Sequence, residues 1–330
     1  MERGLERVII ANPKEDAWVF AKKVYNQIGK IEKGILKRKK LDFKLGELII
    51  QEHPDQEFEP QIVPNVRSRN VIFIHNSRKD PAKWWVEAML VNDAALRASA
   101  KSLTYVFPYT RWSRSEKKDK PHIPIGTKAF MNTIGLYPQL PKRIITLDLH
   151  AEAIAGFADM PIDALESQAY VAEYIKKEIH PEVIVSPDEG AVRRTTKFAE
   201  VIKGDLAIVY KKRISGKKVE VYKVVGDVKG KICLVSDDIL STAGTMAEDA
   251  RVLREKGAKK VYGYATHCVG AGDWRKNLKE LDGFFTTNTF HHDYTGMENV
   301  KVISLAPLFA KAIYNSESGD SVSALFNPKK

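Results

Sequence analysis

The chain has 330 residues, 44% of them hydrophobic and 29% charged, a composition typical of a globular protein large enough for two domains. Its formal net charge of +11 favours anionic partners, either nucleic acids or phosphorylated metabolites. Only two cysteines occur, which excludes a disulfide scaffold and predicts a cytoplasmic location. No apolar run approaches the length of a membrane span, and the first seven residues include acids, so neither a membrane partner nor a signal peptide is expected.

The first half of the chain alternates between strand-like apolar runs and helical patterns. The predicted elements are strands at 8–11, 70–75, 102–107 and 142–150, and helices at 16–28 and 82–99. Residues 37–50 form a basic run that continues into a hairpin-like segment around Gly46. The polar loop at 108–125 is either a binding loop or a solvated connection. Asp148 and His150 stand at the end of the fourth strand, where a single histidine is more often structural than a ligand.

The same alternation starts again near residue 169, which predicts a second domain of the same kind. Its predicted elements are helices at 169–179, 191–201, 246–256 and 306–314, a strand and turn at 181–190, and strands at 206–210, 219–225, 260–267, 284–289 and 300–305. The basic loop after residue 210 is either a surface hairpin or a mobile clamp that brings positive charge to a transferring phosphoryl group.

The most informative stretch lies at 231–250. An apolar run, 232–235, predicts a buried strand, and Asp237 and Asp238 follow where that strand is expected to end. Four small residues, 242–245, then lead into a helix whose free N–H groups suit a phosphate. The aspartates would repel a phosphate, so they are expected to accept hydrogen bonds from sugar hydroxyls or to hold a metal ion. The alternative is an ordinary strand–turn–helix with a capping side chain.

This stretch resembles the phosphoribosyl diphosphate loop of the type I phosphoribosyltransferase fold, in the form found in ribose-phosphate pyrophosphokinases, Val-Asp-Asp-x-x-Asp-Thr-x-Gly-Thr. Ser241 replaces the third aspartate of that pattern. Further resemblances to the same family lie at Phe43, Gly46 and Glu47, at Arg114, Lys117, Lys118 and Asp119, at Asp148 and His150, at Asp188 of Ser-Pro-Asp, and at Lys211 and Arg213. Leu45 and Ser115 depart from the family, which has aspartate and glutamine at those places.

The resemblance covers residues 12–326 and implies an α/β protein with two tandem phosphoribosyltransferase-like domains, each a mostly parallel sheet flanked by helices. The expected first domain is 1–168 joined by the tail 315–330, and the expected second domain is 169–314. The implied assembly is a homo-oligomer built from dimers, with a hexamer as one such assembly.

The implied reaction is transfer of the diphosphoryl group of Mg2+-bound ATP to the 1-hydroxyl of ribose 5-phosphate, which yields phosphoribosyl diphosphate and AMP. The residues implied to bind ATP are Phe43, Glu47, Arg114, Ser115, Asp119 and His150. Those implied to bind ribose 5-phosphate are Asp237, Asp238, Ser241, Thr242, Ala243, Gly244 and Thr245. Lys211, Arg213 and His150 are the implied catalytic residues, and His150 and Asp188 the implied metal site.

The departures at Leu45, Ser115 and Ser241 leave other interpretations open. One is a non-catalytic paralogue that binds nucleotide or sugar phosphate and regulates a partner subunit. Another is an active enzyme with altered donor choice. A basic nucleic-acid-binding protein is disfavoured, because the positive charge lies in the loops expected around phosphates and no nucleic-acid-recognition motif is present.

Overall fold

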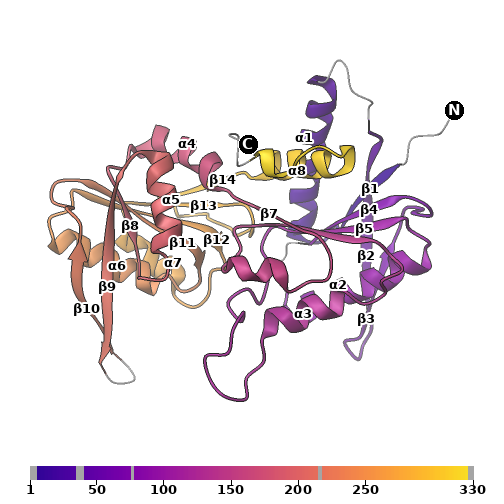
Figure 1. Ribbon diagram of the computed structural model, residues 1–330, viewed down its shortest axis with the longest axis horizontal. Helices are drawn as coiled ribbons and strands as arrows, with labels where there is room; N and C mark the ends of the chain where they lie inside the picture. The colour runs from indigo at the N-terminus through magenta and orange to yellow at the C-terminus, as the bar shows by residue number, and fades with distance from the viewer. Residues whose placement is uncertain (1–5, 35–40, 76–77, 215–217, 326–330) are drawn as a thin grey trace. The chain divides into compact units, whose positions relative to one another are not determined.

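The computed structural model describes residues 6–34, 41–75, 78–214 and 218–325, with side chains at all of these positions except 211–214 and 218–222. The chain forms two compact units, one of residues 1–165 with 305–330 and the other of residues 166–304. Each unit contains a seven-stranded, mostly parallel sheet with flanking helices, which confirms the predicted fold class (Figure 1).

The sheet of the first unit has the strand order β3-β2-β1-β4-β5-β6-β7, and only β3 is antiparallel to its neighbour. Its strands are β1 (Arg7–Ala11), β2 (Phe43–Glu52), β3 (Phe58–Ile62), β4 (Asn70–Ile74), β5 (Ser102–Phe107), β6 (Lys142–Leu147) and β7 (Ile162–Leu165). Its helices are α1 (Asp16–Gly34), α2 (Pro81–Arg97), α3 (Gly126–Ile134), α8 (Ala306–Ser318), and the short η1 (Glu152–Gly156) and η3 (Ser323–Leu325). The central strands are continuous apolar runs because helices cover both of their faces.

The sheet of the second unit has the order β10-β9-β8-β11-β12-β13-β14, with β10 antiparallel to β9. Its strands are β8 (Val183–Ser186), β9 (Asp205–Ile214), β10 (Lys218–Val225), β11 (Ile232–Leu240), β12 (Lys260–Cys268), β13 (Gly283–Thr287) and β14 (Val300–Ile303). Its helices are α4 (Gln168–Ile179), α5 (Val192–Ile202), α6 (Gly244–Glu255), α7 (Trp274–Asn277) and η2 (Leu278–Glu280).

The two sheets share one topology, since adding seven to each strand number of the first order gives the second. In both sheets, successive strands are first added on one side and then on the other. The change of side falls between β1 and β4 in the first unit and between β8 and β11 in the second. Ligands of open α/β sheets bind outside the carboxyl ends of the strands at such a switch point. Each unit therefore has one topologically favoured place for a ligand.

Helix α8 belongs to the first unit, whereas the sequence analysis assigned residues 306–314 to the second. The rings of Phe309 and of Phe20 on α1 pack nearly perpendicular to each other, with their centroids 5.4 Å apart. Glu317 accepts a 2.9 Å hydrogen bond from Arg7 of β1. The predicted boundary was wrong because an apolar helix face shows that a helix is buried but not which sheet it covers.

Candidate active site

The two aspartates of the informative stretch lie inside strand β11, not after it. Asp237 and Asp238 precede the last two residues of the strand, which continues to Leu240. Asp237 Oδ1 accepts the N–H of Asp238 at 2.8 Å, and Asp238 Oδ1 accepts the N–H of Ile239 at 2.9 Å. Asp238 is buried and Asp237 is half-buried. The pair thus stands at the carboxyl end of the strand that flanks the switch point.

Arg194 holds this carboxylate pair, and the sequence analysis missed it. From helix α5, Nη2 lies 3.0 Å from Asp237 Oδ1 and Nη1 lies 3.1 Å from Asp238 Oδ2. Burial and the neighbouring Asp238 charge raise the pKa of Asp237 to about 7, and the guanidinium opposes that rise. A planar guanidinium fork suits two adjacent carboxylates better than a point charge would.

The small-residue loop after β11 leads into α6. Ala243, with φ of +59°, is the residue that precedes the helix, and its side chain supplies no capping hydrogen bond. Asn277 donates to the carbonyl of Thr242 at 2.8 Å, and the carbonyl of Ser241 accepts the N–H of Ala271 at 2.9 Å. Thr242, Gly244 and Thr245 are exposed. Helix geometry leaves the N–H groups of the first turn without partners inside the helix, so they can bind an anion.

Asp188 follows strand β8, the neighbour of β11 in the sheet. Its carboxylate is exposed, and Oδ1 accepts the N–H of Ala191 at 2.9 Å at the start of α5. Among the residues that the structure describes, no three or more histidine, cysteine or acidic side chains are grouped to hold a metal ion. The donor set still suits magnesium, which binds few protein carboxylates and takes its other ligands from water and substrate phosphates.

Lys211 and Arg213 lie on β9, and their side chains fall outside the described part of the chain. The backbone places them beyond the parallel sheet, because β9 pairs with β8 only as far as Ile208 opposite Ser186. From there β9 continues in an antiparallel hairpin with β10. Both positions therefore extend past the carboxyl end of β8.

Two of the residues expected to bind ATP follow neighbouring strands of the first unit. Arg114 lies in the loop after β5, and His150 comes three residues after the end of β6. Both side chains are exposed, as is Asp119 in the same loop as Arg114. Since β5 and β6 are parallel neighbours, these residues share the carboxyl edge of the sheet.

Phe43 does not belong to that edge. It pairs with Arg7 at the amino end of the sheet, keeps 7% of its surface exposed, and stacks on Tyr314 of α8. A ring buried in this way offers little surface to a base, so the expected role of Phe43 in binding ATP stays a prediction. Glu47 is exposed and pairs with Ala11 at the carboxyl end of β1.

Comparisons with known proteins decide the family. The family model for the N-terminal domain of ribose phosphate pyrophosphokinase matches residues 20–136, and the phosphoribosyl synthetase-associated domain matches residues 213–327. A ribose-phosphate pyrophosphokinase of Helicobacter hepaticus is 36% identical over 87% of this chain and 93% of its own length. A ribose-phosphate pyrophosphokinase of Staphylococcus saprophyticus is 36% identical over 86% of this chain and 90% of its own length. The chain belongs to the ribose-phosphate pyrophosphokinase family.

A solved structure supports the same assignment. The phosphoribosylpyrophosphate synthetase of Mycobacterium smegmatis superposes with a TM-score of 0.81 at 27% identity, covering 96% of this chain and 99% of that one. The predicted resemblance is thereby confirmed, and the protein is a transferase. None of the described helices is long and apolar enough to cross a bilayer.

The departures from the family pattern have structural consequences. The hydroxyl of Ser115 accepts the N–H of Gly126 at 3.0 Å, which ties the loop to the first residue of α3. A hydroxyl used in this way has less capacity left for a nucleotide than the glutamine of the family. Leu45 lies within β2, opposite Ile9. Next to it, a Cβ at Gly46 would come within 2.5 Å of Pro64 Cγ, so packing alone accounts for that glycine.

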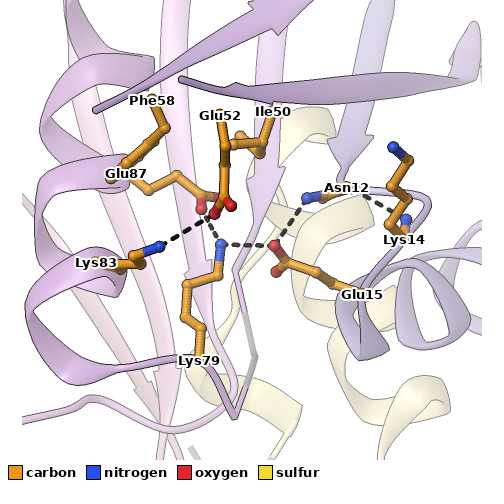
Figure 2. A pocket seen from close by; sticks show the side chains of 9 residues that line it. All are labelled: Asn12, Lys14, Glu15, Ile50, Glu52, Phe58, Lys79, Lys83 and Glu87. Atoms are coloured by element: carbon orange, nitrogen blue, oxygen red, sulfur yellow. Dashed lines mark hydrogen bonds and ion pairs between the residues drawn. The ribbon is translucent and has the colours of Figure 1, made fainter. Parts of the chain in front are cut away.

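A pocket of about 400 Å3 at the carboxyl edge of the first unit was not expected from the sequence (Figure 2). It is lined by Asn12, Lys14, Glu15, Ile50, Glu52, Phe58, Lys79, Lys83 and Glu87. Lys79 lies at its centre and forms ion pairs with Glu87 and, at 2.6 Å, with Glu15. The available signal was the set of charged residues in the loops after β1 and β4 and on the first half of α2, which are far apart in the sequence.

Proposed function

We propose that this family member is a ribose-phosphate diphosphokinase, which transfers the diphosphoryl group of Mg2+-bound ATP to the 1-hydroxyl of ribose 5-phosphate. The observation that carries this proposal is the carboxylate pair Asp237–Asp238, held by Arg194 next to the open first turn of α6. A pentose phosphate has two adjacent hydroxyls, which a carboxylate pair can bind, and a phosphate, which the first turn of α6 and the loop before it can bind. We call this loop and first turn, residues 242–245, the cradle.

The cradle residues would bind the 5-phosphate of the substrate. Gly244 and Thr245 are exposed, and their N–H groups would donate to phosphate oxygens, with the Thr242 and Thr245 hydroxyls beside them. The Gly244 N–H donates a long hydrogen bond of 3.4 Å to Thr242 Oγ1, which a phosphate oxygen would replace. In their ionised forms, Asp237 and Asp238 would accept hydrogen bonds from the 2- and 3-hydroxyls, since an ionised carboxylate only accepts. Ser241 is half-buried and anchors the loop through its carbonyl, so we assign it to the shape of the cradle.

The nucleotide would meet Arg114, Asp119 and His150 at the edge of the first sheet. Attack of the 1-hydroxyl oxygen on the β-phosphorus forms the new bond, and the hydroxyl proton passes to solvent. The bond from that phosphorus to the bridging oxygen of AMP breaks, and AMP leaves with the electron pair of that bond. Lys211 and Arg213 would stabilise the negative charge on the transferred group. Magnesium, when bound, neutralises phosphate charge, and Asp188 and His150 are the residues proposed to hold it. An oxygen ligand suits this ion better than imidazole does, so His150 would act first as a positioning residue.

The test is an assay of purified protein with ribose 5-phosphate, magnesium and a panel of nucleoside triphosphates, with detection of the nucleoside monophosphate product. Lys211→Ala is expected to lower turnover by orders of magnitude while ribose 5-phosphate affinity stays near the wild-type value. A fully active variant would remove this lysine from the mechanism. A wild-type protein that binds ribose 5-phosphate but releases no monophosphate would favour the non-catalytic paralogue. The cytoplasmic location and the homo-oligomeric assembly stay predictions. Light scattering of the purified protein would give its mass in solution and so test the assembly.

A further inference from the structure

We propose that the pocket around Lys79 is a second binding site for a sugar phosphate, which binds its ligand without transferring a group to it. The ligand class rests on the proposed function, because this pocket is the topological counterpart of the site proposed at Asp237 and Asp238. The pocket itself stands on its own geometry in the first unit (Figure 2).

The pocket occupies the favoured place in its sheet. Asn12 and Glu15 follow β1, Lys79 follows β4, and these two strands form the switch point of the first unit. The corresponding strands of the second unit are β8, which Asp188 follows, and β11, which carries the Asp237–Asp238 pair. The duplicated topology therefore puts a cavity with charged walls where the other copy has its proposed sugar phosphate site.

The floor of the pocket contains carboxylate oxygens that lack hydrogen-bond donors. Glu87 is 1% exposed, and its Oε1 has no hydrogen bond. His75 Nδ1 lies 3.5 Å from this oxygen, and burial lowers the pKa of that histidine well below its usual range, so the imidazole is neutral. Glu15 Oε2 is likewise buried and receives no hydrogen bond. Lys79 bridges the other oxygens of these two carboxylates. A buried acceptor without a donor is costly, and hydroxyl groups of a bound sugar would supply the missing donors.

The rest of the lining fits a phosphate and a sugar face. Lys14 and Lys83 provide cations, and Lys83 is 40% exposed and paired with Glu52 at 3.1 Å. An exposed ion pair of this kind contributes little, so a phosphate can replace Glu52 as the partner of Lys83 at small cost. Phe58 and Ile50 offer an apolar wall to the C–H face of a sugar ring.

The helix N-terminus next to this pocket is closed to phosphate. Asp80 accepts the N–H groups of Ala82 and Lys83 at 2.8 and 3.1 Å, and Pro81 has no N–H to donate. At the corresponding end of α6, Ala243 provides no such cap, and the Thr242 hydroxyl accepts the Gly244 N–H at a long 3.4 Å. Phosphate binding in the first unit must therefore come from lysine side chains.

The register of the hairpins explains why this site would bind without catalysis. Glu47 pairs with the last residue of β1, and Ile208 pairs with the last residue of β8. Three and five residues further along, β2 carries Ile50 and Glu52, whereas β9 carries Lys211 and Arg213. The cationic clamp of the second unit is thus replaced by an apolar residue and a carboxylate.

The experiment is calorimetric titration of the full-length protein with ribose 5-phosphate in the absence of nucleotide. We expect two sites per chain in the wild type. Lys83→Glu is expected to weaken one site at least tenfold while turnover at saturating substrate is retained. Thr245→Asp, which puts a carboxylate into the cradle of α6, is expected to abolish the other site. Lys23→Glu on α1 is the charge-matched control and should keep both sites.

The outcomes separate the two proposals. A single site that disappears in Thr245→Asp and persists in Lys83→Glu overturns the second site and leaves the proposed function intact. A single site that persists in Thr245→Asp and disappears in Lys83→Glu overturns the proposed location of the substrate. Ribose and inorganic phosphate serve as separate probes of the Lys83 site. If phosphate alone binds this site as tightly as ribose 5-phosphate does, the sugar-binding role of Glu15 and Glu87 is refuted. Glu87→Gln tests the same role, and the melting temperature of this variant reports whether it remains folded.

Discussion

Arg194→Ala is the substitution that tests the proposed substrate site most directly. The guanidinium lies 3.0 and 3.1 Å from one oxygen each of Asp237 and Asp238, and these two carboxylates are adjacent in one strand. Without it, their mutual repulsion is uncompensated and the pKa of Asp237, already raised to about 7, rises further. We expect the variant to fold, to bind ribose 5-phosphate weakly, and to turn over at a rate close to that of the wild type when substrate is saturating.

The burial of the pair sets the size of the effect. Removing one partner of a fully buried ion pair costs about 3–5 kcal/mol, whereas fully exposed pairs contribute about 0–1 kcal/mol. Arg194 has 26% of its side chain exposed and Asp238 only 3%, so the pair lies between these limits. A loss of about 2 kcal/mol corresponds to a roughly 30-fold weaker affinity for ribose 5-phosphate. Arg194→Lys keeps the charge but loses the fork, so its loss should be intermediate.

The assay is steady-state turnover against ribose 5-phosphate concentration, repeated from pH 6 to pH 9. Because the raised pKa keeps Asp237 protonated near neutral pH, the KM of Arg194→Ala should improve as the pH rises, while the KM of the wild type changes less. Arg251→Ala is the matched control, since Arg251 also contacts two carboxylates, Glu248 and Glu280, but on the exposed face of α6. A KM within twofold of the wild type in Arg194→Ala would refute the reasoning.

Three further changes have defined outcomes. Burial raises the pKa of Glu87 to about 7, against the charge of Lys79, so the protonated form favours the folded state and stability falls as the pH rises from about 4.5 to 7. Glu87→Gln should remove roughly 3 kcal/mol of that fall, measured by urea unfolding at pH 5 and 7.5. Gly263→Ala should cost about 1–3 kcal/mol in the same assay, because the new methyl group would collide with Met246 on the first turn of α6 and lie 2.8 Å from Leu281. In a donor competition assay, ATP should be replaceable by other nucleoside triphosphates more readily than is usual in the family, given Leu45 and the bonded hydroxyl of Ser115; strict adenine selectivity would contradict this.

The sequence allowed prediction of the duplicated fold because its strands are short apolar runs separated by helical patterns. In parallel sheets both faces are covered, so strands such as β4 and β5 read as continuous hydrophobic segments. Less was visible at the edges: β3 contains Pro60 and alternates in exposure, and β7 has only four residues, so neither was predicted. The edge strands β10 and β14 of the second unit were predicted, at 219–225 and 300–305.

The part of the candidate site formed by residues close together in the sequence was predictable, and the part formed by residues far apart in the sequence was not. Asp237, Asp238 and the loop to Thr245 are contiguous in sequence, so their chemistry could be read together. Arg194 is 43 residues away from Asp237 and meets it only because β8 and β11 are neighbours in the sheet. The burial of Phe43 was likewise invisible in the sequence: the residue type suits a base, but in its register with Arg7 only 7% of its surface is exposed.

The two helix N-termini at the switch points show how one fold can support different chemistry. The first turn of a helix carries unsatisfied N–H groups and roughly half a positive charge. In α2 these are satisfied within the chain by Asp80, which stabilises the first unit whether or not a ligand is bound. In α6 the preceding residue is Ala243, and a capping side chain there would contribute about 1 kcal/mol that the protein forgoes. The Thr242 hydroxyl accepts the Gly244 N–H at 3.4 Å, a weak substitute for such a cap. A weakly capped helix beside a carboxylate pair is a stability cost that a bound phosphate would offset, which is why the second unit is the better candidate for the substrate.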